Sequence, residues 1–116
     1  MKTVILENKW RNSRGEIDGW SFILDENTIQ WSYNALFDAK EHLHSSGQAS
    51  FELGSFKQLI IEYRQNKIAK LEGIDSGSVS LKLTPEDKVE ITIRAAYGGD
   101  GCISIIDAAK LDGLFL

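Results

Sequence analysis

The fold is indicated most clearly by residues 78–94, SVSLKLTPEDKVEITIR. Apolar and polar side chains alternate strictly from Ser78 to Leu83 and again from Lys88 to Arg94, the pattern of a strand with one buried face. The tripeptide Pro85-Glu86-Asp87 between them predicts a turn. We therefore expect an antiparallel hairpin with one face in the core and the other in solvent.

The neighbouring segments extend this hairpin into a larger sheet. Gly98-Gly99-Asp100-Gly101 predicts a second turn, and the apolar run Cys102–Ile106 predicts a third strand of an antiparallel meander. Residues 68–71 predict one more strand before the hairpin. An amphipathic helix is expected upstream, from the N-cap residue Ser55 to about Asn66, whose side chain suits a left-handed C-terminal position. Its buried face has the spacing i, i+3, i+4 and i+7: Phe56, Leu59, Ile60 and Tyr63.

The N-terminal half gives a less regular pattern. It predicts a strand over residues 2–8, a polar loop over residues 9–19 and another strand over residues 48–53. Residues 20–24 and 28–33 alternate on either side of Asp25-Glu26-Asn27 and predict a hairpin. Residues 34–44 are ambiguous, and a second helix around residues 35–44 is expected from the spacing of Leu36, Phe37 and Leu43.

Together these elements predict an α+β fold: a mainly antiparallel β-sheet, in part a meander, with one or two helices packed on one face. The 116 residues suffice for a single domain, residues 1–116, and 42% of them are hydrophobic, enough to form a core. The N-terminal apolar run is too short for a secretory signal, and no segment is long enough for a membrane helix. With a single cysteine, Cys102, we expect a cytoplasmic protein without an internal disulfide.

The charge pattern limits the partners that we expect. The net charge is −4, and the sequence has no basic stripe, so nucleic acid and anionic membranes are not predicted partners. The acidic residues are unevenly distributed, because residues 15–39 contain five acids and neither lysine nor arginine.

No residue pattern predicts catalysis, a cofactor or a metal. The glycine-rich segment 98–101 lies between two alternating segments rather than before a helix, which favours a turn over a phosphate loop. His42 and His44 could share a face of a strand, but no third ligand is nearby in the sequence, and we interpret them as exposed loop residues. Cys102 is interpreted as a small apolar residue rather than a nucleophile. We therefore expect a protein that is not an enzyme.

The hairpin over residues 20–33 combines aromatic and acidic residues. By the period of two, Trp20 shares one face with Phe22, and Trp31 shares one with Ile29. All of these side chains could form the core. A tryptophan that faced solvent among acids would instead suit contact with a basic protein. On the second interpretation, the partner-binding candidates are Asp18, Trp20, Asp25, Glu26 and Trp31.

The order of elements is similar to that of a known class of proteins. The segments FELGSF (51–56), SVSLKL (78–83), VEITI (89–93) and DGCISI (100–105), with the helix after the first, resemble small immunity proteins of bacterial polymorphic-toxin and contact-dependent growth inhibition systems. The resemblance covers about the last two-thirds of the chain and lies in the order and pattern of its elements. It implies a protein without enzymatic activity that binds a cognate toxin domain tightly. Such toxin domains are often basic nucleases, which an acidic inhibitor would attract. It assigns no individual site residues.

Two alternatives to an immunity protein remain at this stage. One is a small-ligand-binding or enzymatic domain with its pocket between the helix and the sheet. The other is a structural homodimer that uses a meander edge strand or the apolar C-terminus, residues 111–116. An apolar C-terminus must pack either on the core of its own chain or on another chain.

Overall fold

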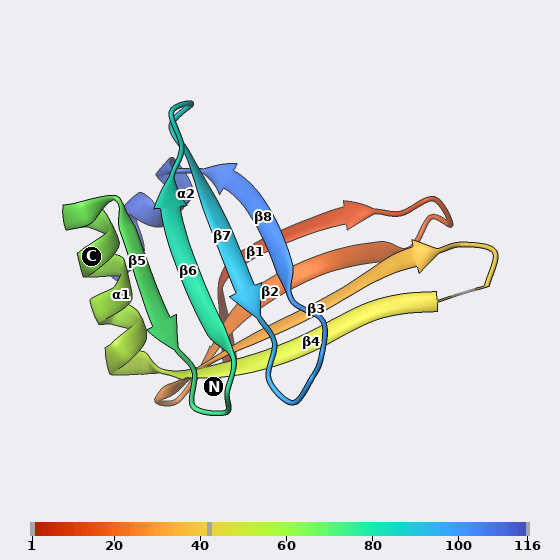
Figure 1. The fold of residues 1–116 in the computed structure, drawn as a ribbon, viewed down its shortest axis with the longest axis horizontal. Coiled ribbons are helices and arrows are strands. Elements are labelled where there is room, and N and C mark those ends of the chain that lie inside the picture. The colour runs from red at the N-terminus through yellow and green to blue at the C-terminus, as the bar shows by residue number, and fades with distance from the viewer. Residues whose placement is uncertain (1, 42, 116) are drawn as a thin grey trace.

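The chain forms two four-stranded antiparallel sheets joined by a helix, as the computed structural model of residues 2–41 and 43–115 shows (Figure 1). The first sheet has the order β1-β2-β3-β4, and its strands are Lys2–Arg11, Ile17–Asp25, Thr28–Asp38 and Leu43–Glu52. Helix α1, Leu53–Asn66, follows. The second sheet has the order β5-β6-β7-β8, with strands Ile68–Glu72, Ser78–Leu83, Lys88–Arg94 and Cys102–Asp107. A short helix α2, Ala109–Asp112, comes after it. The predicted α+β class and the antiparallel meander are confirmed.

The two sheets lie against each other and share one core. Their facing side chains are large and apolar, because each strand turns every second residue toward the other sheet. The first sheet contributes Trp20, Phe22, Ile29, Trp31 and Phe51, and the second contributes Val79, Leu81, Val89, Ile91 and Ile93. The sequence predicted one sheet, whereas the chain forms two layers with α1 running beside β5 (Figure 1).

Helix α1 begins three residues earlier than the N-cap at Ser55 predicts, because Glu52 takes the N-cap position. The backbone N–H of Leu53 donates to the Asn27 carbonyl in the β2–β3 turn at 2.9 Å, so this hairpin satisfies one of the free amides at the helix N-terminus. At the other end Lys67, rather than Asn66, takes the left-handed conformation, with its N–H on the Tyr63 carbonyl. The predicted buried face of Phe56, Leu59, Ile60 and Tyr63 is confirmed.

The expected helix around residues 35–44 is wrong. Strand β3 continues to Asp38 and β4 begins at Leu43, with an irregularity in register between Leu36 and Asp38. The expected polar loop 9–19 is also shorter, because β1 runs to Arg11 and β2 starts at Ile17. In residues 35–44, hairpin pairing of β3 with β4 replaces the local helical preference, and in residues 9–19 the pairing of β1 with β2 extends into the expected loop.

The apolar C-terminus packs on its own chain. The ring of Phe115 meets that of Phe56 edge-on, with centroids 6.1 Å apart. The guanidinium of Arg64 on α1 donates to three carbonyls of the C-terminal segment: those of Leu111, Asp112 and Leu114. Of the two packing modes that the sequence left open, the described residues up to Phe115 therefore use the core of the same chain.

Candidate functional site

The first sheet extends beyond the second at one end, where the β1–β2 and β3–β4 connections lie (Figure 1). We call this the far end and define it by four segments: the end of β1, the start of β2, the end of β3 and the start of β4. Strands of the first sheet have nine to eleven residues, and those of the second have five to seven. The shorter sheet therefore leaves the far end uncovered.

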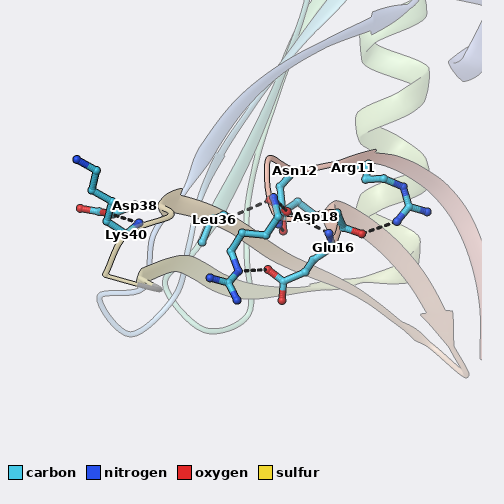
Figure 2. Close-up of polar contacts among 9 residues, drawn as sticks. Arg11, Asn12, Glu16, Asp18, Leu36, Asp38 and Lys40 are labelled. Carbon is cyan, nitrogen blue, oxygen red and sulfur yellow. Dashed lines mark hydrogen bonds and ion pairs between the residues drawn. The ribbon is translucent and has the colours of Figure 1, made fainter.

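A buried carboxylate holds the far end together. Asp18 is only 2% exposed, and its two oxygens bind groups from two different segments. Asn12 Nδ2 donates to Oδ1 at 3.0 Å, and the backbone N–H of Leu36 donates to Oδ2 at 2.9 Å (Figure 2). Asp18 thus joins the β1–β2 turn to β3 at the place where the β3–β4 register becomes irregular. A buried carboxylate with such partners fixes the position of both segments.

Both connections at the far end are braced by short-range hydrogen bonds. In the first, Asn12 Oδ1 accepts from the backbone N–H groups of Arg14 and Glu16 at 2.9 and 3.1 Å. Arg14 also pairs with Glu16, at 3.3 Å between Nε and Oε1. In the second, Asp38 Oδ1 accepts from the N–H group of Lys40 (Figure 2). It also accepts from the N–H group of Glu41. Side-chain oxygens that bind the backbone in this way favour one turn conformation over others.

Each strand exposes one large apolar side chain at the far end. They are Trp10 on β1, Ile17 on β2, Phe37 on β3 and Leu43 on β4, with exposed fractions of 40%, 57%, 65% and 46%. Charged residues of both signs lie close to them in the sequence: Arg11, Arg14, Glu16, Lys40 and Glu41. Apolar and aromatic side chains with a charged rim are typical of protein–protein contact surfaces.

The five residues that the sequence singled out for partner contact do not form one surface. Trp20 and Trp31 are at most 1% exposed, which confirms the alternative that both belong to the core. Asp18 is buried and holds the far end together. Asp25 and Glu26 are accessible but lie at the β2–β3 turn, and the seven steps along β2 from Asp18 to Asp25 span about 23 Å. The residues exposed at the far end were missed, because Ile17 falls in the predicted polar loop and Phe37 and Leu43 fall in the expected helix.

Cys102, at the start of β8, is half-buried. Desolvation raises the pKa of its thiol from 9.0 to about 11, so the reactive thiolate is disfavoured. His44 is exposed on β4, and its companion His42 falls outside the described residues. Among the described residues, no group of three or more His, Cys, Asp or Glu side chains could hold a metal ion.

The glycine-rich segment forms the connection between β7 and β8, as the turn interpretation predicts. Gly98 has a φ of 73°, and the N–H of Gly99 bonds the Ala96 carbonyl at 3.1 Å. A cleft of about 210 Å³ also lies between α1 and β5, lined by Ser55, Gln58, Leu59, Glu62, Lys70 and Leu71. It is smaller than the roughly 300 Å³ at which small-molecule sites begin.

No helix in the described part of the chain is long and apolar enough to cross a membrane. No protein-family model, curated protein or solved structure matches this chain.

Proposed function

We propose that this protein acts by binding another protein through the far end of its first sheet. The supporting observation is the set of four exposed apolar side chains, Trp10, Ile17, Phe37 and Leu43, one from each strand. Trp10 and Ile17 lie on opposite faces of the sheet, because Trp10 pairs with Asp18 and Arg11 pairs with Ile17. A partner that encloses the far end from both faces removes this apolar area from solvent, and that loss favours association.

The braced turns make this surface suitable for tight binding. Asp18 and Asn12 hold the β1–β2 turn, and Asp38 holds the start of the β3–β4 connection. A surface that is already ordered loses little conformational entropy when the partner binds. The charges around the apolar side chains would orient the partner, and the net charge of −4 would attract a basic one.

Within this class, we propose that the chain is an immunity protein that neutralises a cognate toxin domain. The proposal needs no catalytic group on this chain, since a projecting end can enter a concave active site and exclude the substrate. The half-buried Cys102 and the buried Asp18 would then contribute to the fold and not to chemistry.

Growth rescue tests the proposed function. The chain is co-expressed with the C-terminal domain of a secreted toxin encoded directly upstream of its gene, and rescue of growth is expected. A chain carrying Trp10→Ala and Phe37→Ser should lose the rescue, because both substitutions remove exposed apolar contact area. The same pair should leave the unfolding temperature nearly unchanged, since surface substitutions alter stability by about 0.5 kcal/mol or less.

The matched control is Ile68→Ser on β5, which removes another apolar side chain that is 59% exposed but lies away from the far end. This variant should keep the rescue. Failure of the native chain to rescue would contradict the immunity role. Full rescue by the folded double variant would contradict the use of the far end.

A further inference from the structure

A second surface lies at the edge of the first sheet, where two loops of the second sheet meet β4. Three carbonyls of β4 accept hydrogen bonds from these loops: Ser50 from the N–H of Ile74, Gln48 from Ala96 and Ser46 from Asp100, at 2.8, 2.8 and 2.9 Å. The edge that β4 would otherwise offer to another strand is thereby paired. The β7–β8 loop is consequently fixed to β4, which it crosses in Figure 1.

Gly47 permits this close contact. A Cβ at this position would lie 2.0 Å from the Asp100 carbonyl oxygen and 2.8 Å from the Ala95 Cβ. Ser45 Oγ also donates to Asp100 Oδ2 at 2.8 Å. The loop is therefore held by both backbone and side-chain bonds.

Tyr97 lies at the tip of this fixed loop and is 86% exposed. Its φ of 55° is in the left-handed region, which bulky residues seldom adopt and which costs on the order of 1 kcal/mol. The ring makes no hydrogen bond or ring contact with the described part of the chain. An aromatic ring held in solvent by a strained backbone is a feature of ligand-binding loops.

A cleft of about 390 Å³ lies beneath Tyr97, within the range of small-molecule sites. It is lined by Ser32, Tyr33, Ser46, Gly47, Gln48, Ala96, Tyr97 and Gly99. Ser32 and Gln48 are direct cross-strand partners, so with Ser46 they share the face of the sheet turned away from the core. These three side chains form no hydrogen bond to the described residues, and they supply hydroxyl and amide groups to the cleft.

The lining residues define the chemistry of a ligand. All of them are uncharged, so the cleft offers no counter-charge to a phosphate or a carboxylate. The exposed ring of Tyr97 can stack on a flat, weakly polar face. Hydroxyl and amide groups that both donate and accept hydrogen bonds match the same groups on a ligand. A sugar ring combines these properties, since its C–H bonds form an apolar face and its hydroxyls project from the rim.

We propose that this cleft binds a neutral saccharide. In this arrangement Tyr97 stacks on a sugar ring, and Ser32, Ser46 and Gln48 bind its hydroxyl groups. The proposal does not rest on the protein-binding role of the far end, because none of the cleft-lining residues belongs to the four exposed apolar side chains there.

The test is a titration of the isotope-labelled full chain with maltotriose, cellotriose and triacetylchitotriose. Binding is monitored by the chemical shifts of the backbone amides. At least one of the three is expected to give saturable shifts centred on Gln48 and Tyr97. Tyr97→Ala should weaken that binding about tenfold, equivalent to about 1.4 kcal/mol. It should leave the unfolding temperature nearly unchanged, because the ring is exposed and alanine keeps the Cβ that causes the backbone strain.

Two controls decide the outcome. Trp10→Ala removes an exposed aromatic residue at the far end and should leave saccharide affinity unchanged, whatever it does to protein binding. Glucose 6-phosphate serves as an anionic probe and should bind more weakly than the neutral sugars. The absence of saturable shifts with all three trisaccharides, equal affinity in the Tyr97→Ala variant, or tighter binding of the anionic probe would each overturn the proposal.

Discussion

The two ends of the first sheet contain the same four strands but differ in the burial of their large apolar side chains. In the half that the second sheet covers, Trp20, Phe22 and Trp31 are buried. At the far end, Trp10 and Phe37 are exposed. Alternation along a strand therefore indicates which side chains share a face, and the length of the opposing sheet decides whether that face is covered. Four predictions test this comparison.

The largest difference is expected between two phenylalanines. Phe22 is buried, and its ring packs against those of Trp20, Phe51 and Phe56. Phe22→Ala should lower the free energy of unfolding by about 3–5 kcal/mol, because it removes apolar contacts and leaves a cavity. Phe37→Ala should change it by about 0.5 kcal/mol or less. Urea unfolding of both variants measures the difference. Similar losses of unfolding free energy would show that Phe37 is packed as Phe22 is.

Asp18→Ala should have the next largest effect. It leaves the Leu36 N–H and Asn12 Nδ2 without their acceptor, at a cost of about 2 kcal/mol. Amide hydrogen exchange should accelerate at Leu36 and in the β1–β2 turn, while the buried half of the sheet stays protected. Asp25→Ala, at the opposite end of β2, is the matched control, because the Asp25 side chain makes no hydrogen bond to the described residues. Unchanged exchange at Leu36 in the Asp18 variant would contradict the bracing role.

Ser104→Ala tests the polar contact between the two sheets. Trp20 Nε1 donates to Ser104 Oγ at 2.9 Å, and its loss should lower the free energy of unfolding by about 1 kcal/mol. The indole N–H resonance of Trp20 should shift. Trp31 serves as an internal reference, because its buried Nε1 has no partner among the described residues. A shift of Trp31 equal to that of Trp20 would indicate a general rearrangement instead of one lost bond.

Ionisation of Cys102 should affect stability only at alkaline pH. Its thiol has a pKa of about 11 in the folded chain, against 9.0 when unperturbed, so the unfolded chain loses its proton first as the pH rises. The stabilisation from this shift is complete below pH 9.0 and is lost between pH 9.0 and about 11. Denaturant unfolding across this range should show a shallower decline for Cys102→Ala than for the native chain. Parallel declines would contradict burial of the thiol.

The second sheet and α1 could be predicted from the sequence almost element by element. Alternation specifies β6 and β7, Pro85 marks the turn between them, and the spacing of Phe56, Leu59, Ile60 and Tyr63 specifies the buried face of α1. These patterns are local in the sequence, and the elements form where the patterns predict them.

The end of β3 depends on contacts that no local pattern contains. Leu36, Phe37 and Leu43 fit one face of a helix, yet the Leu36 N–H binds the carboxylate of Asp18, eighteen residues earlier. The division into two sheets was missed for the same reason, because alternation does not say which strands pair. The exposed side chains of the far end could not be predicted for the same reason, since the exposure of Trp10 and Phe37 depends on where the second sheet ends.

Strand order in both sheets follows the order of the chain, and this has a consequence for synthesis. Every pairing in the first sheet can form once residue 52 has left the ribosome, before any strand of the second sheet exists. At about 5–20 residues per second, translation of residues 53–107 takes several seconds. During that interval Trp20, Phe22 and Trp31 have no opposing layer. The nascent chain is therefore most open to chaperones, and to aggregation, after its first sheet has formed and before β8 is made.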